Sequence, residues 1–242
     1  MSDHKRFGEI IPTMDGSLTL RHPDHKQDYH SSEGAKFEAN ALYVDASGFK
    51  QALDTQENVV VLDVGMGLGY NACASIAAWL QSSGKATLEL VSIEIEPFLV
   101  ESVATAKAPW QEKWDQDWLA GPLALKEIED NFYQALLKHP KTEIEAKWNV
   151  WIVDGASQLW SEGARKFQFV WQDPFTAELN PSMWSKEWFD RLNGLASPGA
   201  VLMTYSVARV VRDALMLGGW AVERIPTPGR KKHWLKATKG YS

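Results

Sequence analysis

VVVLDVGMGLGYN, residues 59–71, is the stretch that decides the fold of this chain. Its first half is a run of β-branched and apolar residues of the kind found in buried parallel strands. Its second half places glycine at positions 65, 67 and 69, just before a helical pattern that runs from Ala72 to about Gln81. The stretch therefore predicts a strand, a tight glycine turn and a helix whose free N–H groups face a ligand.

The spacing of these glycines narrows the class of ligand. A dinucleotide fingerprint, G-x-G-x-x-G, would place glycine at position 70, where this chain has tyrosine. The run resembles the form seen in S-adenosylmethionine-dependent methyltransferases, and a second apolar strand, Leu88 to Ile95, adds a carboxylate that suits two ribose hydroxyls. A glycine-rich surface turn with a solvated glutamate is the alternative. The residues predicted to bind a nucleoside cofactor are Asp63, Gly65, Gly67, Gly69 and Glu94.

Composition and charge restrict the remaining possibilities. The chain has 242 residues, of which 45% are hydrophobic and 23% charged, so one domain with a substantial core is expected. Its only cysteine is Cys73, which excludes a disulfide framework and a cysteine-based zinc site within one chain. No apolar run approaches the ~20 residues that span a bilayer, and we expect a cytoplasmic protein without a membrane segment or a metal. The net charge of −6 argues against a broad basic face, so local patches must hold any RNA partner.

Strands and helices alternate along the chain from residue 58 onward. This order predicts an α/β fold of the Rossmann-like, class I methyltransferase type, with a mainly parallel sheet, helices on both faces and a C-terminal antiparallel hairpin. We expect residues 1–57 to form a small extension that covers substrate and cofactor, and residues 58–242 to form the methyltransferase domain. The expected strands are 58–63, 88–95, 150–154, 167–173, 200–204, 220–225 and 233–237, and the expected helices are 72–81, from 97 onward, 186–195 and 207–217.

The region between residues 108 and 147 is less regular. Apolar residues at helical spacing predict an amphipathic helix over 123–138. Trp110, Trp114 and Trp118 recur every four residues, which favours a helix face packed into the core, or a lid, over a platform that stacks bases.

An acidic residue ends each of four expected strands. Ligands of parallel sheets bind outside the carboxyl ends of the strands, so these four acids are expected to converge on one cleft. A single acid in such a position is often a helix N-cap, which does not account for four in succession. Asp154 is expected to accept a hydrogen bond from the adenine amine of the cofactor, with an Asx turn as the alternative. The four acids are Asp63, Glu94, Asp154 and Asp173.

The tripeptide Asp173-Pro174-Phe175 indicates methylation of an amine. Enzymes of that kind often carry an acid or amide, a proline and an aromatic residue after this strand. The acid accepts hydrogen bonds from the amine while the ring packs on the substrate base. An alkylammonium has a pKa of about 10, so a base or an apolar pocket must favour the neutral amine. Asp173 is the candidate for that base, against an ordinary Asp-Pro turn.

Further motifs carry a family resemblance over nearly the whole chain. The sequence resembles the methyltransferase domain of the bifunctional tRNA 5-methylaminomethyl-2-thiouridine biosynthesis proteins, and still more their stand-alone bacterial relatives. The most specific marks are the segment 173–184, the N-terminal segment and the run from Gly229 to Lys232. Further marks are the segments 92–94 and 204–212, and the segment 65–71, which many methyltransferases share.

The resemblance implies a substrate and a set of site residues. The implied reaction moves a methyl group from S-adenosylmethionine to the primary amine of 5-aminomethyl(-2-thio)uridine at the wobble position, in the anticodon stem-loop of tRNA. Asp173 would lie beside that amine, and Glu38 and Asn71 would help to bind the cofactor. The implied substrate contacts are Tyr29, Pro174, Phe175, Tyr205, Arg230, Lys231 and Lys232.

Other functions stay open at this point. A methyltransferase for a small-molecule or protein amine would tolerate the acidic composition. A non-catalytic tRNA-binding relative would keep the fold, although the intact glycines and Glu94 speak against it. The bifunctional relatives carry a flavin-dependent oxidase domain that exposes the amine, and we expect the amine substrate of this chain to arise by another route or from a separate enzyme. The oligomeric state is open.

Overall fold

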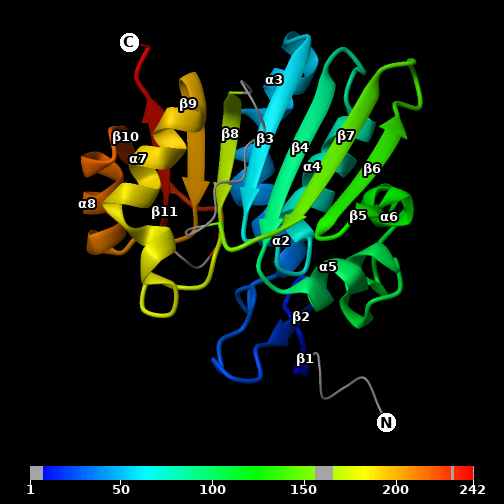
Figure 1. The fold of residues 1–242 in the computed structure, drawn as a ribbon, viewed down its shortest axis with the longest axis horizontal. Coiled ribbons are helices and arrows are strands. Elements are labelled where there is room, and N and C mark those ends of the chain that lie inside the picture. The colour runs from blue at the N-terminus through cyan, green and yellow to red at the C-terminus, as the bar shows by residue number, and fades with distance from the viewer. Residues whose placement is uncertain (1–7, 156–165, 230–231, 242) are drawn as a thin grey trace.

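The structure of this chain is a computed structural model that describes residues 8–155, 166–229 and 232–241. Its strands are β1 (Glu9–Pro12), β2 (Leu18–Arg21), β3 (Asn58–Val64), β4 (Thr87–Glu94), β5 (Lys126–Glu129), β6 (Phe132–Lys138), β7 (Glu145–Ile152), β8 (Phe167–Gln172), β9 (Ala196–Thr204), β10 (Trp220–Pro226) and β11 (His233–Lys239). Nine of them form one sheet in the order β10-β11-β9-β8-β3-β4-β7-β6-β5 (Figure 1). The strands from β9 to β7 are parallel and the outer pairs antiparallel, which confirms the predicted mainly parallel sheet and C-terminal hairpin.

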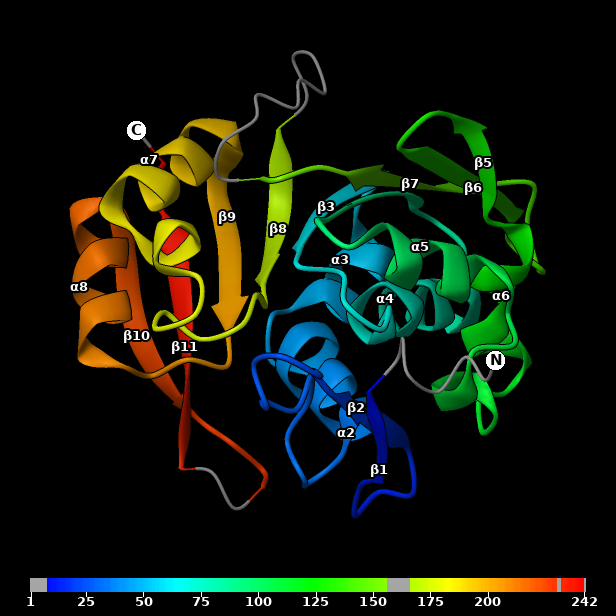
Figure 2. The ribbon, with the colours of Figure 1, turned by 60° about the horizontal axis from the view of Figure 1, so that its bottom comes forward.

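Helices cover both faces of this sheet (Figure 2). One face packs against η1 (Ala39–Asp45), α3 (Phe49–Thr55), α4 (Tyr70–Gln81), α5 (Pro97–Ala104), η2 (Pro109–Gln111) and α6 (Gln116–Ala124), with α2 (Ala35–Glu38) beside them. The other packs against η3 (Pro181–Trp184), α7 (Lys186–Leu195) and α8 (Arg209–Leu217). None of the helices in the described part of the chain combines the length and the hydrophobicity needed to cross a bilayer.

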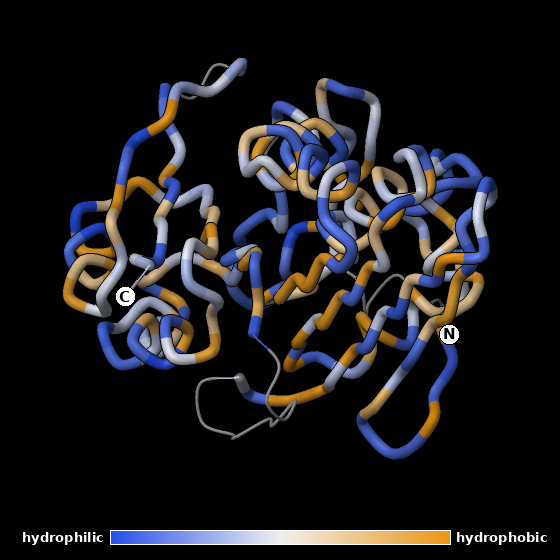
Figure 3. The backbone as a smooth tube through the Cα atoms, turned by 90° about the horizontal axis from the view of Figure 1, so that it is seen from above, coloured by the Kyte–Doolittle hydropathy of each residue, from blue (hydrophilic) through white to orange (hydrophobic). Residues whose placement is uncertain are grey.

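The central strand β3 contributes to two hydrophobic cores at once. Val59 and Val61 belong to the core under α4, whereas Val60 and Leu62 belong to the core under α7. A parallel sheet that is covered on both faces requires such a continuously apolar strand. Hydrophobic residues accordingly follow the central strands in Figure 3, with hydrophilic loops around them.

The predicted helix over residues 123–138 is wrong. Apart from the end of α6, this region forms the antiparallel strands β5 and β6, and Ile128 and Leu136 of the expected apolar stripe are 58% and 59% exposed. Burial along β6 alternates, with Tyr133 facing the core, because this strand pairs with β7. Asn131, at φ 64°, makes the turn between the two strands in the left-handed conformation that asparagine tolerates. The apolar residues of this region recur at the helical period of 3.6 residues by coincidence. Pairing of β6 with β5 and β7 determines that the region forms strands.

Three tryptophans support the loop and the helix that follow β3. Trp110, Trp114 and Trp118 are buried in the core, as expected, although they do not share one helix. The rings of Trp114 and Trp118 pack edge-on against Tyr70, with centroid distances of 4.9 and 5.9 Å. The indole N–H of Trp110 donates to the carbonyl of Leu68 at 2.9 Å. This packing fixes the position at which α4 begins.

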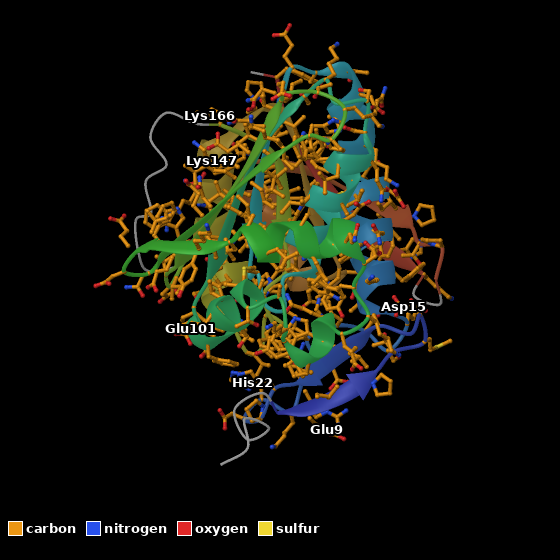
Figure 4. All side chains as sticks on the ribbon, turned by 90° about the vertical axis from the view of Figure 1, so that its right-hand side faces the viewer. Glu9, Asp15, His22, Glu101, Lys147 and Lys166 are labelled. Atoms are coloured by element: carbon orange, nitrogen blue, oxygen red, sulfur yellow. The ribbon has the colours of Figure 1, made fainter. Side chains whose placement is uncertain are left out.

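The N-terminal segment lies below the carboxyl ends of the parallel strands (Figure 1). Its strands β1 and β2 form a separate antiparallel pair. Asp15 ties the segment to α2, because its Oδ2 accepts the N–H of Phe37 at 2.7 Å. The hydroxyl of Tyr70 donates to the carbonyl of Leu18 at 2.7 Å and joins the segment to α4. Asp15 and His22 on this segment stand at the opposite end of the molecule from Lys147 and Lys166 (Figure 4).

Candidate active site

A cleft of about 850 Å³ opens at the carboxyl ends of the parallel strands. Loops after β3, β4, β7 and β8 form one wall, and residues between His22 and Glu38 form the other. Among the described residues that line the cleft there is no lysine or arginine. The acids that line it are Asp28, Glu33, Glu38, Glu94, Glu96, Asp154 and Asp173. Such a lining suits a cationic ligand.

The glycine loop after β3 lies directly against the turn after β8. Gly65 has a φ of 77°, and a Cβ at this position would be 3.0 Å from the Cα of Pro174. Gly67 has a φ of 53° and faces the ring of Tyr29. Gly69 instead faces Val103 of α5, away from the cleft. The structure thus brings Gly65 beside the Asp-Pro-Phe turn and Gly67 beside Tyr29, and the loop can pack this closely because neither residue has a side chain.

Glu94 ends β4 and is held by backbone N–H groups. Its Oε2 accepts from Gly67 at 2.7 Å, and its Oε1 accepts from Ile95 at 2.8 Å and from Glu96 at 3.0 Å. Burial raises the pKa of the Glu94 carboxyl, and these hydrogen bonds oppose that effect. The side chain therefore joins the tip of β4 to the glycine loop, and Oε2, which accepts only one of these hydrogen bonds, can still accept from a ligand hydroxyl.

Asp173 follows β8 and lines the cleft. Its N–H donates to the carbonyl of Val64 at 3.0 Å, and its Oδ2 accepts from Asn71 Nδ2 at 2.7 Å. Asn71 lies in the first turn of α4 and is itself buried behind Asp173, so it does not line the cleft. Burial raises the pKa of Asp173 well above its usual range, and the neighbouring Glu38 raises it further. A carboxyl of this kind, open to a cleft, can exchange a proton with a bound substrate.

Two tyrosines stand near Asp173. Tyr205 follows β9 and lines the cleft, and its hydroxyl donates to the carbonyl of Pro174 at 3.0 Å. Tyr43 is fully buried in the π-helix η1, and burial together with Asp173 raises the pKa of its hydroxyl. Tyr43 is not among the residues that the sequence predicts for the site. A π-helical turn departs from the 3.6-residue period, so no periodicity could have marked this residue.

Aromatic rings line the cleft where the N-terminal segment meets the turn after β8. The Phe175 centroid lies 4.8 Å from that of Tyr29, and 5.5 and 5.8 Å from those of His22 and His25. The Nδ1 of His22 accepts the N–H groups of Asp24 and His25 at 3.1 and 3.2 Å, and burial lowers the pKa of this imidazole. The His22 ring is therefore neutral, with its proton on Nε2. Neither histidine is among the predicted site residues, because isolated histidines in a loop form no sequence pattern.

Most of the predicted site residues meet in this cleft, but Asp63 does not. Asp63 is fully buried beneath it, where Oδ2 accepts the hydroxyl of Ser92 at 2.8 Å. The predicted convergence of four acids is therefore right for three and wrong for Asp63. Side chains alternate along β3, so Asp63 lies on the same face of the sheet as Val59 and Val61, the face that packs against α4. The predicted residues that line the cleft are Tyr29, Glu38, Gly65, Gly67, Glu94, Asp154, Asp173, Pro174, Phe175 and Tyr205.

The segment that follows β10 reaches the rim of the cleft at Gly229. Gly229 lies against Glu33, which lines the cleft, since a Cβ on this glycine would be 2.5 Å from Glu33 Oε2. Lys232 is exposed and directly precedes β11. Arg230 and Lys231, which the sequence also assigns to the substrate, lie outside the described residues.

Comparisons with known proteins agree with this geometry. Residues 124–240 match a family model described as S-adenosyl-L-methionine-dependent methyltransferase. The chain is 32% identical to the tRNA 5-methylaminomethyl-2-thiouridine biosynthesis bifunctional protein MnmC of Azoarcus sp. (strain BH72), over 86% of this chain and 32% of that protein. It is 30% identical to the protein of the same name from Thiobacillus denitrificans, over 86% of this chain and 33% of that protein. The chain thus spans about a third of the length of these curated relatives.

A solved structure supports the same fold. MNMC2 from Aquifex aeolicus matches with a TM-score of 0.74 at 23% identity, over 97% of this chain and 70% of that chain. The glycine loop, Glu94 and these matches make the chain similar to the S-adenosylmethionine-dependent methyltransferases, and they indicate S-adenosylmethionine as its cofactor. Within that class, the chain is similar to the methyltransferase domain of the bifunctional 5-methylaminomethyl-2-thiouridine biosynthesis proteins.

Replacing Glu94 by glutamine is expected to weaken the binding of S-adenosylmethionine by about tenfold or more. The NH₂ group of the glutamine amide cannot accept a hydrogen bond. Either the N–H of Gly67 or the N–H groups of Ile95 and Glu96 therefore lose their acceptor. Isothermal titration calorimetry measures the dissociation constant. Glu127→Gln, on the exposed strand β5, is the matched control. Equal affinities for the two variants would contradict the role of Glu94.

Proposed function

We propose that this protein methylates the primary amine of 5-aminomethyl(-2-thio)uridine at the wobble position of tRNA. The observation that carries the proposal is the position of Asp173, which stands between the glycine loop and the ring of Phe175 and is held by Asn71. The relatives named for 5-methylaminomethyl-2-thiouridine biosynthesis support the choice of substrate.

The residues of the cleft fit the chemistry of S-adenosylmethionine. When bound, this cofactor supplies an electrophilic methyl group on a positively charged sulfur. Glu94 would accept hydrogen bonds from the ribose hydroxyls, and Asp154 would accept one from the adenine amine. Gly65 and Gly67 would let the backbone approach the cofactor closely. The acids around the cleft would stabilise the positive charge.

Asp173 would prepare the amine for attack. An alkylammonium has no free lone pair, so the ionised carboxylate accepts one proton from it and leaves a neutral, nucleophilic nitrogen. Asn71 holds Oδ2 of the carboxylate during this transfer. Tyr29 and Phe175 would pack against the pyrimidine and exclude water, which favours the neutral amine further.

The RNA backbone would stay outside the cleft. Phosphates are repelled by the acidic lining, so only the modified base enters, as in other enzymes that extract a base for chemistry. Lys232, together with Arg230 and Lys231, would bind phosphates of the anticodon stem-loop at the rim. Residues 1–57 would act as the cover that the sequence suggests, because the segment around Tyr29 and Glu38 forms the second wall. A tRNA substrate would be met in the cytoplasm.

The test is methylation of tRNA that carries the free amine. Purified protein and S-adenosylmethionine are expected to convert 5-aminomethyl-2-thiouridine to its N-methyl form, as read by mass spectrometry of the nucleosides. Transfer RNA without the aminomethyl group is the control and should remain unchanged. A second candidate, methylation of a small-molecule amine, is favoured by the absence of lysine and arginine among the described lining residues. Methylation of free alkylamines but not of the tRNA would replace the proposal with that candidate.

A further inference from the structure

Asp63 occupies a fully buried position between three elements. Its Oδ2 accepts the hydroxyl of Ser92 on β4, and the oxygen of Ser92 accepts the indole N–H of Trp148 on β7, at 2.8 and 2.9 Å. On the side of α4, the Asn71 amide is close enough to Asp63 to lower its pKa by hydrogen bonding. A buried carboxylate usually has a cationic partner. Among the described residues, no salt bridge to Asp63 is formed.

Two acceptor oxygens at this place have no partner within the described residues. They are Oδ1 of Asp63 and Oδ1 of Asn71, and both are buried. An acceptor that is buried without a hydrogen-bond partner destabilises the folded protein. Two acceptors cannot satisfy one another unless a proton lies between them. One proton on the carboxyl would satisfy both atoms.

We propose that Asp63 retains its proton in the native protein and donates it to Oδ1 of Asn71. The amide of Asn71 is thereby fixed in one orientation, with Nδ2 directed at Oδ2 of Asp173, where the 2.7 Å hydrogen bond is found. If the amide turned over, its oxygen would face the Asp173 carboxylate and repel it. Asp63 is thus a positioning residue that acts on the proposed base through Asn71. The inference rests on the proposed function only for the role of Asp173.

The electrostatic surroundings of Asp63 favour the protonated form. Burial raises the pKa of Asp63 to about 7, and this effect outweighs the side chains of Ser92 and Asn71, which lower the pKa by hydrogen bonding. Glu94 on β4 adds negative charge on one side, and Asp173 after β8 interacts with Asp63 on another. From α4, the thiol of Cys73 also faces Asp63 and has a pKa raised by burial. Glu94 and Asp173 would repel an ionised Asp63, and the neutral thiol of Cys73 offers no positive charge to balance it.

Infrared spectroscopy of the protonated carboxyl tests the proton without any substrate. The wild-type protein at about pH 6 is expected to show a buried carboxylic acid band that Asp63→Asn lacks and Asp173→Asn retains. This band should disappear as the pH rises through the pKa of Asp63, about 7. If Asp63→Asn removes no such band, the carboxyl is ionised and the proposal is overturned, whatever the substrate of the enzyme.

Activity then tests the positioning role. Asp63→Ala should lower kcat by on the order of 10²-fold, because Asn71 loses the contact that orients it, while the dissociation constant for S-adenosylmethionine changes little. Asp63→Asn should recover most of that loss, since its amide can donate to the same oxygen of Asn71. The ratio of its kcat to that of the wild-type protein should increase above about pH 7, where wild-type Asp63 loses its proton. Equal losses in both variants, at every pH, would refute the positioning role.

Stability provides an independent check of the same proton. The pKa of Asp63 is raised from its usual 3.8 to about 7, so the unfolded chain releases this proton at lower pH than the native protein. The wild-type free energy of unfolding should therefore contain a contribution that is present below about pH 4 and lost as the pH rises to about 7. In urea titrations, Asp63→Asn should lack this loss. Identical pH dependence of the two proteins would contradict the proposal.

Discussion

Asp173→Ala is expected to reduce the rate of methyl transfer by about 10²- to 10⁴-fold, the usual contribution of a general base. The carboxylate at this position is the described group best placed to take a proton from an amine beside the glycine loop. The rate in the wild-type protein should rise with pH, because burial raises the pKa of Asp173 and only the ionised form accepts a proton. Single-turnover methylation measured across a pH series reads both effects.

Binding and folding controls separate this loss from simple damage. Asp173→Asn keeps the shape of the side chain and should be as inactive as Asp173→Ala, with S-adenosylmethionine still bound. Asp130→Asn, in the exposed turn between β5 and β6, is the matched control and should leave the rate at its wild-type value. If Asp173→Asn retained a substantial rate and its pH dependence, the carboxyl would orient the amine without accepting its proton.

Gly65→Ala is expected to reduce the affinity for S-adenosylmethionine by at least about tenfold, and to destabilise the fold. The backbone at this position has a φ of 77°, which costs a residue with a Cβ about 1–2 kcal/mol. The Cβ would also lie 3.0 Å from the Cα of Pro174 and 3.1 Å from its nitrogen, and neither backbone atom can move aside without displacing Asp173. Calorimetry with the cofactor and thermal unfolding measure the two losses.

A second glycine isolates the part of this effect that comes from the contact. Gly48 has a φ of 87°, but a Cβ there would meet nothing within 4 Å. Gly48→Ala should therefore show the conformational cost alone, with unchanged affinity for the cofactor. Equal losses of cofactor affinity in the two variants would show that packing of the glycine loop against the Pro174 turn is not what shapes the site.

Much of the fold could be predicted because strands buried on both faces leave a strong record in sequence. The run before Gly65, the strands that carry Glu94 and Asp173 and the final hairpin all form close to their predicted limits. Residues 123–138 failed because a few apolar residues satisfied two periods at once, and only pairing with β7 decides between them. The sequence pattern of residues 123–138 alone carries no information about this pairing with a strand further along the chain.

The candidate site was predictable where chemistry and topology coincide. Acids at strand ends and glycines before a helix mark one edge of a sheet, and Glu94, Asp154 and Asp173 line the cleft there. Asp63 also ends a strand, but its side chain points into the core. Side chains alternate along β3, so Asp63 lies on the same face of the sheet as Val59 and Val61, which are buried under α4. Tyr43 could not be found either, since only the irregular helix η1 brings it to Asp173.

The borders of the sheet have a practical consequence for handling the protein. Strands at a border present unpaired amides that can recruit another molecule and seed aggregation. Along β5 the side chains are exposed and include Lys126, Glu127 and Glu129, and β10 ends in Pro226, which has no N–H to offer. Charged side chains on β5 and the missing backbone N–H group at the end of β10 therefore oppose pairing with the edge strands of other molecules. We expect the protein to stay in solution at the high concentrations that infrared spectroscopy of a single carboxylic acid requires.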